Sequence, residues 1–361
     1  MSEMLPPGGT IGILGGGQLG RMLSVAASRL GLKVHIYADG PDSPAGQFAA
    51  ETVIGAYDDE AKIAEFAKGV DVITCEFENV SAGALDAAAK GARVAPPARA
   101  FAITQDRLLE KQFVEELGIP VAPFVAVDTA DDLRKAVEKL GTPALLKTRR
   151  FGYDGKGQVV VRKVNDAEAA MEEIGGQPAI LEGFVKFDRE VSVVVARALD
   201  GTLGFYDVAE NHHQDGILSS SRIPANITGN CTYKAREIAG KIASALEHVG
   251  VLCVEMFHCE GDADELVVNE IAPRVHNSGH WTIDGCQASQ FENHIRAIAG
   301  WPLGPTGRHS DAVMTNLIGH DVDRWPKLAA DERVALHLYG KAETRPGRKM
   351  GHFTKISPKS S

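Results

Sequence analysis

The chain has 361 residues, of which 44% are hydrophobic and 24% are charged, and its formal net charge is −10 at pH 7. These values are typical of a globular protein with two or three domains, and the negative charge excludes a general attraction to nucleic acid or acidic lipid. The five cysteines show no CxxC spacing, and the N-terminus does not resemble a signal peptide. No apolar run approaches the ~20 residues of a membrane span. These features together predict a cytoplasmic protein.

A βαβ unit is predicted at the start of the chain. Residues 10–14 (TIGIL) are expected to form a buried strand, residues 21–30 a helix and residues 33–37 a second strand. Between the first strand and the helix stands Gly15-Gly-Gly-Gln-Leu-Gly20, a G-x-G-x-x-G turn, and Asp39 follows the second strand. Backbone N–H groups at such a helix N-terminus predict a phosphate-bearing ligand, with a dinucleotide as one alternative. The other alternative is a tight strand-to-helix crossing that uses the same glycines.

The alternation of strands and helices continues to a break at Pro96-Pro97. A strand is predicted at residues 71–75, and Glu76-Phe-Glu-Asn79 follows it at once. Acidic groups at the carboxyl end of a parallel strand lie where ligands of open sheets bind. The alternative for Glu76 and Glu78 is a role at the start of the next helix. The proline pair predicts a first domain boundary near residue 100.

Cations are concentrated in the next part of the chain. An amphipathic helix over residues 104–118 carries Arg107 and Lys111 one turn apart, and most such pairs are solvated. Lys147 lies near the end of a predicted strand, and residues 149–157 (RRFGYDGKG) follow it. Glycines and cations in one short segment predict a flap that closes over a triphosphate, although the spacing is not that of a P-loop. The alternative is an exposed hairpin loop.

Two apolar runs on either side of residue 262 predict a β-hairpin. Residues 251–257 and 266–271 flank Gly261-Asp-Ala-Asp264, which has turn chemistry. With these four residues as the loop, Glu255 and Glu270 lie directly opposite each other, with Cβ atoms about 4.5–5.5 Å apart. Two carboxylates so placed repel, and a divalent cation held by oxygen ligands is the usual compensation. The alternative is a pair of solvated carboxylates on an exposed sheet face.

Polar groups gather twice more before the end of the chain. Residues 274–280 (RVHNSGH) contain arginine, histidine, asparagine and serine, and residues 345–349 (RPGRK) form a compact basic loop. In an acidic protein such a loop suits a phosphate, although a solvated loop fits the composition equally well. A phosphate-binding first domain, a cationic flap and two opposed carboxylates are the apparatus of phosphoryl transfer. The residues therefore predict an ATP-dependent ligase or kinase.

Five segments resemble one known family. They are GGGQLGRML, KTRRFGYDGKGQ, NHHQDGI, the stretch from NEIAPRV to FENHIRAI, and RPGRKMGH, and they are similar to the N5-carboxyaminoimidazole ribonucleotide synthetases, ATP-grasp enzymes of purine biosynthesis. The resemblance implies a mixed α/β and α+β ATP-grasp fold. Its implied parts are an N-terminal Rossmann-like (pre-ATP-grasp) domain at residues 1–102, an ATP-grasp domain at 103–305 whose smaller lid subdomain lies within 103–185, and a small C-terminal domain at 306–361.

The resemblance also implies a reaction. Bicarbonate attacks the γ-phosphate of ATP to give carboxyphosphate, and the amine of 5-aminoimidazole ribonucleotide is then carboxylated, with release of ADP and phosphate. The implied cofactors are ATP and Mg²⁺, with two metal ions, and a cytoplasmic homodimer fits the family. The rival interpretations are another ATP-grasp ligase (a glycinamide ribonucleotide transformylase or a biotin carboxylase), a nicotinamide dehydrogenase, and an inactive nucleotide-binding regulator.

The functional residues of that family match positions in this chain. The metal carboxylates match Glu255 and Glu270. The positions matched to ATP are Arg107, Lys147, Glu182, Gly183, Phe184, Val185, Glu190, His213, Asn269 and Glu270. The positions matched to the ribonucleotide are Gln18, Leu19, Glu76, Arg345 and Lys349. The positions matched to the closing loop and the reaction centre are Tyr153, Asp154, Lys156, His276 and Asn277.

Two positions depart from the family pattern. Many ATP-grasp enzymes have Glu-x-Asn as their second metal motif, but Ala272 stands at its last position, so water or a phosphate oxygen is expected to replace that ligand. Lys156 stands where some relatives have arginine, and this change removes a bidentate contact.

Overall fold

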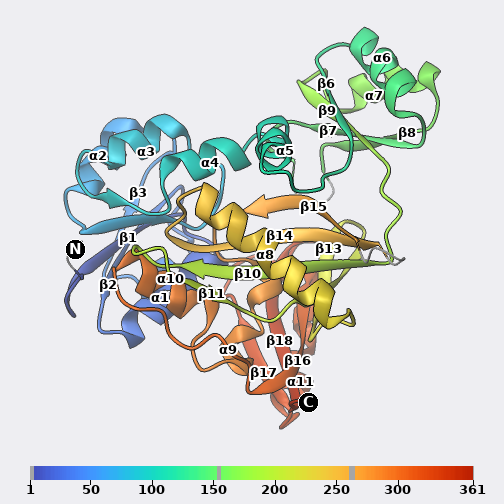
Figure 1. The fold of residues 1–361 in the computed structure, drawn as a ribbon. Helices are drawn as coiled ribbons and strands as arrows, with labels where there is room; N and C mark the ends of the chain where they lie inside the picture. The colour runs from blue at the N-terminus through green and yellow to red at the C-terminus, as the bar shows by residue number, and fades with distance from the viewer. Residues whose placement is uncertain (1–3, 153–155, 260–264, 361) are drawn as a thin grey trace.

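The computed structural model describes residues 4–152, 156–259 and 265–360. Within these residues the strands form three sheets of five, nine and four strands. The five-stranded sheet lies beside the nine-stranded sheet, and the four-stranded sheet stands apart at the far end of α5 (Figure 1). No helix in these ranges is long and apolar enough to cross a membrane.

The five-stranded sheet is parallel, with the order β3-β2-β1-β4-β5. Its central strands are short apolar runs that are almost wholly buried, as expected for strands covered on both faces. The strands are β1 (Thr10–Leu14), β2 (Lys33–Ala38), β3 (Glu51–Ile54), β4 (Val72–Cys75) and β5 (Arg93–Val94). The helices are α1 (Gln18–Arg29), η1 (Gly46–Phe48), α2 (Glu60–Ala67), α3 (Ala82–Ala88) and α4 (Ala98–Thr104). The predicted βαβ unit is confirmed.

The four-stranded sheet is antiparallel, with the order β6-β9-β7-β8. Its elements are β6 (Phe124–Val127), α6 (Ala130–Leu140), β7 (Ala144–Thr148), β8 (Gln158–Val161), η2 (Val164–Asp166), α7 (Ala167–Glu173) and β9 (Ala179–Gly183). The helix predicted at 104–118 is shorter, because Asp106 caps α5 (Arg107–Glu116) by accepting the N–H groups of Leu108 and Leu109.

The nine-stranded sheet is antiparallel and has the order β15-β14-β10-β12-β13-β16-β18-β17, with β11 paired to β10. Its strands are β10 (Arg189–Arg197), β11 (Leu203–Phe205), β12 (Ala209–Gln214), β13 (Ile217–Ile223), β14 (Gly250–Cys259), β15 (Glu265–Ala272), β16 (Ser310–Ile318), β17 (Val334–Leu338) and β18 (Lys349–Pro358). The accompanying helices are α8 (Gly229–Ala245), η3 (Asn277–Gly279), α9 (Thr282–Gly285), α10 (Gln290–Ile298), η4 (Gly319–Arg324) and α11 (Trp325–Ala329).

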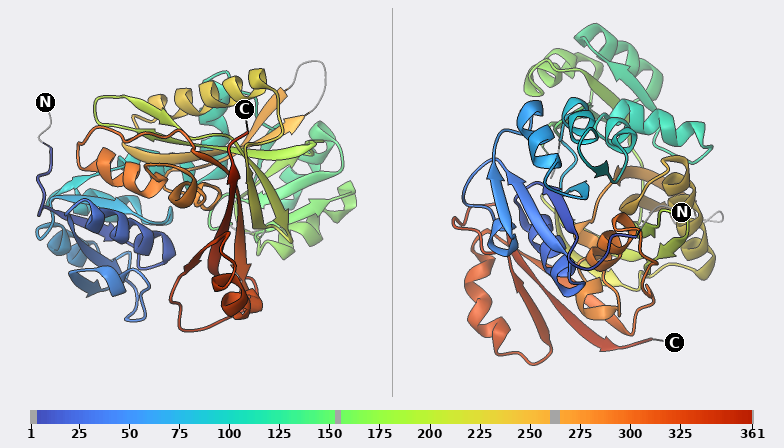
Figure 2. Two further views of the ribbon diagram at one scale, coloured as in Figure 1. Left: turned by 90° about the horizontal axis from the view of Figure 1, so that it is seen from below. Right: turned by 90° about the vertical axis from the view of Figure 1, so that its left-hand side faces the viewer.

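Alternation along β10 divides the core of this sheet between its two faces. Val191, Val193 and Val195 pack in one hydrophobic cluster with α8, whereas Val194 and Ala196 pack in another with α10. The sheet continues through the β13–β16 pairing into the C-terminal residues, which project from the body of the molecule as long strands (Figure 2). The sheet is therefore continuous across the predicted boundary at residues 305 and 306, and the position of that boundary stays a prediction.

One buried histidine joins the first sheet to the large sheet. The backbone N–H of Val251 donates to Nδ1 of His294 at 3.1 Å, so the ring proton is on Nε2, which lies 2.8 Å from Oγ1 of Thr74 in β4. Burial lowers the pKa of His294 to about 3, so the ring is neutral. Gly250 has a φ of 121°, and a Cβ atom there would lie 2.9 Å from this ring. Glycine is therefore required at this contact.

Candidate active site

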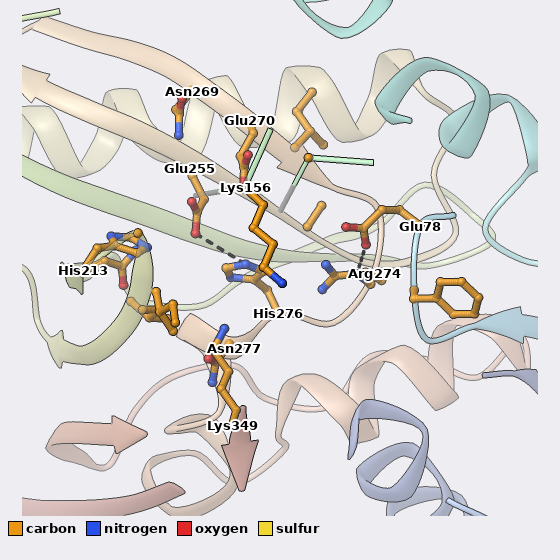
Figure 3. A pocket seen from close by; sticks show the side chains of 18 of the residues that line it. Glu78, Lys156, His213, Glu255, Asn269, Glu270, Arg274, His276, Asn277 and Lys349 are labelled. Carbon is orange, nitrogen blue, oxygen red and sulfur yellow. Dashed lines mark hydrogen bonds and ion pairs between the residues drawn. The ribbon is translucent and has the colours of Figure 1, made fainter. Parts of the chain in front are cut away.

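A cavity of about 990 Å³ is lined by residues in or next to all three sheets. It brings together most of the site residues predicted from the sequence (Figure 3). The predicted residues that line it are Gln18, Leu19, Glu76, Arg107, Lys147, Lys156, Glu190, His213, Glu255, Asn269, Glu270, His276, Asn277, Arg345 and Lys349.

Six predicted residues are not among those that line the cavity in the described structure. Residues 182–185, predicted to form an adenine-binding hinge through their backbone, are not among the lining residues, and the Phe184 ring is largely exposed. Tyr153 and Asp154 lie outside the described residues. The functional roles of all these residues stay predictions.

The hairpin of β14 and β15 presents the two carboxylates. Glu255 and Glu270 are paired, as predicted. Nearer the turn the strands pair one residue out of the predicted register, with Cys259 opposite Glu265. A β-bulge at Asn269 adds one residue to β15 and so brings Glu270 opposite Glu255, as predicted. The predicted turn at 261–264 lies outside the described residues. A bulge re-aims side chains, and here the successive residues Asn269 and Glu270 both line the cavity together with Glu255 (Figure 3).

Helix α5 supplies hydrogen-bond partners for the backbone around this bulge. Glu110 Oε1 accepts the N–H of Ile271 at 2.6 Å, and Lys111 Nζ donates to the carbonyl of Asn269 at 2.9 Å and to that of Val268 at 3.3 Å. Both side chains are buried. The interpretation of Lys111 as a solvated residue is therefore wrong. Its burial comes from the packing of β15 against α5, and the helical pattern of the sequence holds no signal of that contact.

The residues present at the hairpin fit a divalent cation. Burial and the neighbouring Glu270 raise the pKa of Glu255 to about 8, as expected for a buried carboxylate opposite a second one. Oδ1 of Asn269 is buried and has no hydrogen-bond partner in the described structure. No cluster of three or more His, Cys, Asp or Glu suited to a metal occurs among the described residues. Two carboxylates, one amide oxygen and oxygens from a phosphate or water would complete a Mg²⁺ site without a ligand at Ala272.

Three cations lie close to this hairpin. Half-buried Arg107 lies 3.3 Å from Glu270, and its guanidinium also donates to the carbonyl of Gly152 within the predicted flap. Lys147 in β7 lies 3.0 Å from Glu182, and Lys111 lies 3.6 Å from the same carboxylate. Burial alone would raise the pKa of Glu182, but the charges of the two lysines lower it by more. The pKa therefore lies below its usual value, and the carboxyl is ionised. The Glu182 side chain thus holds the two lysines in place.

The flap predicted at 149–157 joins the antiparallel strands β7 and β8. Its described part lines the cavity with Arg149, Phe151, Gly152 and Lys156. Arg149 binds both carboxylate oxygens of Asp106, the cap of α5, at 2.7–3.0 Å. The base of the flap is therefore fixed to the helix that also carries Arg107.

Two residues predicted to contact the nucleotide bind each other. His213 Nδ1 and Glu190 Oε2 form an ion pair on the neighbouring strands β12 and β10. Burial alone would lower the pKa of His213, but the Glu190 carboxylate raises it by more, so the ring pKa lies above its usual value. The pair presents a polar edge to the cavity beside Glu255 (Figure 3).

The glycine-rich turn binds an anion from its own domain. The N–H groups of Gly17 and Gly20 donate to the Glu76 carboxylate, the latter at 2.6 Å. A Cβ atom at Gly15 would lie 2.1 Å from Cγ of Glu76, so the glycines allow this close approach. The N–H groups of Gly17 and Gly20 are therefore not available to a phosphate, and the predicted phosphate-bearing ligand at this helix N-terminus loses two of its donors. The geometry agrees with the alternative of a tight strand-to-helix crossing, and a dinucleotide at this turn stays a prediction.

The basic loop and the residue 274–280 segment complete the cavity. Arg345, in the connection between β17 and β18, and Lys349, the first residue of β18, line it, and Lys341 of the same connection adds a cation. Arg274 forms an ion pair with Glu78 (Figure 3). Sequence reasoning assigned no role to Lys341, and the only signal for it is its nearness to the RPGRK segment.

Two amides next to the cavity fix each other. Asn277 Nδ2 donates to Oδ1 of Asn316 at 3.0 Å, and Asn316 Nδ2 donates back to Oδ1 of Asn277 at 2.8 Å. Asn316 lies in β16 and also donates to the carbonyl of Leu218 at 2.8 Å. Because Asn316 is 39 residues away in the chain, local sequence patterns hold no signal for this partner.

The fold and the site define an ATP-grasp ligase. A family model of the ATP-grasp domain matches residues 112–291, one of the ribonucleotide synthetase preATP-grasp domain matches residues 9–105, and one of the phosphoribosylaminoimidazole carboxylase C-terminal domain matches residues 312–361. The fold class expected from the sequence is confirmed.

Individual relatives identify the family. The chain is 51% identical over 358 residues to an N5-carboxyaminoimidazole ribonucleotide synthase of Brucella melitensis, covering 99% of this chain and 98% of that protein. It is 42% identical to the synthase of Bacillus subtilis, covering 98% of this chain and 92% of that protein. The chain belongs to the N5-carboxyaminoimidazole ribonucleotide synthase family, and the resemblance noted in the sequence is confirmed.

Solved structures agree with this assignment. An ADP complex of an N5-carboxyaminoimidazole ribonucleotide synthetase has a TM-score of 0.95 at 41% identity, covering 99% of this chain and 94% of that chain. The Aspergillus clavatus synthase, in complex with ADP and 5-aminoimidazole ribonucleotide, has a TM-score of 0.91 at 33% identity, covering 98% of this chain and 94% of that chain.

Replacing Lys111 should destabilise the protein and weaken nucleotide binding. Lys111→Met leaves the carbonyls of Val268 and Asn269 without this buried donor and removes one of the two lysines beside Glu182, so the free energy of unfolding should fall by about 3 kcal/mol. Urea unfolding measures this change, and Lys135→Met on the exposed side of α6 is the matched control. Equal losses in both variants would contradict the role of Lys111 at the bulge.

The stability of the metal-free protein should depend on pH through Glu255. Its folded-state pKa lies above the unfolded value, so its contribution to stability is present below the unfolded pKa and is lost as pH rises through about 8. Between pH 6 and pH 9 the unfolding free energy of Glu255→Gln should therefore rise relative to wild type by about 2 kcal/mol.

Urea unfolding at several pH values tests this expectation. Burial and Glu270 also raise the pKa of Glu110 to about 8. Glu110 therefore lowers the unfolding free energy with rising pH in both proteins, and its effect is present in wild type and in Glu255→Gln alike. Glu138→Gln on the exposed side of α6 controls for the loss of one carboxylate. Parallel pH profiles for wild type and Glu255→Gln would show that the two carboxylates do not repel in the folded state.

Proposed function

We propose that the chain carboxylates 5-aminoimidazole ribonucleotide to N5-carboxyaminoimidazole ribonucleotide, with bicarbonate as the carbon source and cleavage of ATP to ADP and phosphate, in purine biosynthesis. The observation that carries the proposal is one cavity with two differently charged sides. The opposed carboxylates of the hairpin, with Arg107 of α5 and Lys147 of β7, form one side, and the basic residues between β17 and the start of β18 form the other. A relative that is 33% identical binds ADP and 5-aminoimidazole ribonucleotide together.

The hairpin side suits the triphosphate. Arg107 and Lys147 would neutralise the charge of the phosphates, and burial lowers the pKa of Lys147, so a nearby phosphate would help to keep it charged. Glu255, Glu270 and the Asn269 amide oxygen would hold Mg²⁺, with two ions as in the family resemblance. The metal would screen the developing charge on the phosphoryl oxygens. Glu190 and His213 would contact the nucleoside.

The opposite side suits the ribonucleotide. Arg345 and Lys349 would bind its phosphate, and Gln18, Leu19 and Glu76 would line the imidazole and ribose region. The exocyclic amine would then lie near His276 and Asn277, between the two sides of the cavity. Tyr153, Asp154 and Lys156 would close over both substrates.

The reaction then follows in two steps. A bicarbonate oxygen attacks the γ-phosphorus, the bond to the β-phosphate oxygen breaks, and ADP and carboxyphosphate form. The carboxyl carbon is next transferred to the amine, directly or as released CO₂, while its bond to the phosphate oxygen breaks and the amine loses a proton. Catalysis consists of positioning and charge neutralisation, and neither requires a nucleophilic side chain. We also propose that the enzyme works as a homodimer in the cytoplasm.

Release of ADP should require ATP, Mg²⁺, bicarbonate and 5-aminoimidazole ribonucleotide together. A coupled assay for ADP, with each component left out in turn, tests this requirement, after allowing for a bicarbonate-dependent background. Glycinamide ribonucleotide with formate, or biotin with bicarbonate, should not replace the ribonucleotide. Equal ADP release without 5-aminoimidazole ribonucleotide would contradict the assignment, and tight quenching on titration with NADH would favour a dehydrogenase.

Replacing Glu270 should slow the reaction without unfolding the protein. Glu270→Gln removes one metal carboxylate, so kcat should fall at least about hundredfold, because a metal-held phosphoryl clamp supplies several kcal/mol. Isothermal titration of Mg²⁺ with ADP should show weaker binding. Glu265→Gln, on the same strand and exposed, is the matched control. Wild-type turnover in Glu270→Gln would remove this residue from the site.

A further inference from the structure

Two hydrogen-bond donors converge on Nδ1 of His276. The backbone N–H of Ser278 donates to it at 3.3 Å, and Oγ of Ser278 lies 2.9 Å away. A backbone N–H cannot accept a hydrogen bond, so Nδ1 carries no proton and the Ser278 hydroxyl must also donate to it. The ring proton of His276 is therefore on Nε2.

A chain of buried side-chain hydrogen bonds, called the line below, leads from Ser221 through Asn211 and Ser192 to Ser278, and each of its bonds has a defined donor. Oγ of Ser192 lies 2.8 Å from Oγ of Ser278, Nδ2 of Asn211 donates to Ser192 at 2.9 Å, and Ser221 donates to Oδ1 of Asn211 at 2.8 Å. Because the single hydroxyl proton of Ser278 points at His276, Ser192 must donate to Ser278, and the Asn211 amide N–H must donate to Ser192. The three serines are 0–1% exposed, so bulk water does not compete for these bonds.

The other ring nitrogen faces the carboxylate hairpin. Nε2 of His276 lies 3.5 Å from Oε1 of Glu255, across the part of the cavity that Lys156 and Asn277 also line (Figure 3). An N–H group that a buried network aims at the place where an oxygen anion would form has the geometry of oxyanion stabilisation. A ring nitrogen that carries a proton has no free lone pair, so it cannot act as a base.

We propose that His276 is a fixed hydrogen-bond donor, through Nε2–H, to the oxygen anion that forms beside Glu255, and that Ser278, Ser192 and Asn211 are positioning residues that hold this tautomer. The donor role rests on the proposed function, because the anion belongs to carboxyphosphate or its precursors. It follows that Nε2 of His276 does not take the proton that the amine loses.

Nitrogen NMR of the full chain with ¹⁵N-labelled histidine rings tests the tautomer without any assay of activity. The signals of His276 are those lost in His276→Asn. Nδ1 should have a pyridine-like shift and Nε2 a pyrrole-like shift. A pyrrole-like Nδ1, alone or together with Nε2, would overturn the proposal. The correct tautomer in a protein without ribonucleotide-dependent ADP release would contradict the proposed function and leave the assignment of the positioning residues intact.

Two variants separate positioning from general stability. Ser192→Ala interrupts the line and leaves only the long 3.3 Å bond from the backbone N–H of Ser278 to hold the tautomer, so signals of both tautomers should coexist and kcat should fall about tenfold, with the KM for ATP unchanged. Ser24→Ala is the matched control, since Ser24 is equally buried but donates only within α1, and it should retain the wild-type tautomer. Retention of the wild-type tautomer by Ser192→Ala would overturn the role of the line.

Asn211→Asp provides a second test, because it should reverse which groups donate and which accept along the line. A carboxylate can only accept, so Ser192 should turn toward it and the ring proton of His276 should move toward Nδ1. Asn293→Asp places the same charge at a buried amide that contacts Tyr206 and Gly304, outside this network. A tautomer that moves equally in both variants, or in neither, would contradict the proposal.

Discussion

Repulsion between two opposed carboxylates is the constraint on which the rest of this structure depends. Glu255 and Glu270 face each other across β14 and β15, and burial together with their mutual charge raises the pKa of Glu255 to about 8. Arg107 lies against one of them, and a bulge brings the amide oxygen of Asn269 to the same side. A pair of strands does not keep such a geometry unaided. Side chains from α5 bind the backbone around the bulge, so the helix and the hairpin form one unit.

That unit explains why three sheets share one cavity. The helix that holds the bulge also carries Arg107, and its cap Asp106 holds the base of the flap through Arg149. Lys147 from the small sheet reaches the same region and pairs with Glu182. Charge neutralisation of a triphosphate would thus draw on elements far apart in the chain. The basic connection between β17 and β18 supplies the opposite side of the cavity, and this separation suits two anionic substrates that must meet without repelling each other.

Backbone N–H groups decide the chemistry of several side chains in this protein. Those of Gly17 and Gly20 bind Glu76, which leaves the glycine-rich turn occupied by the protein itself. A backbone N–H sets the tautomer of His294 where two sheets join, and at the cavity another acts together with the Ser278 hydroxyl on His276. In each case the backbone donor cannot reverse its role, so it fixes which atoms remain available to a ligand.

The sequence by itself determined the fold class, the family and the pairing of Glu255 with Glu270, because strand alternation, turn residues and specific motifs are local properties of the chain. It also located most of the residues that line the cavity. Only the tertiary structure decided that Lys111 is buried, that Glu76 fills the glycine-rich turn and that a bulge at Asn269 corrects the register of the hairpin. These features depend on contacts between segments far apart in the sequence, where burial and hydrogen-bond geometry, rather than local pattern, set the outcome.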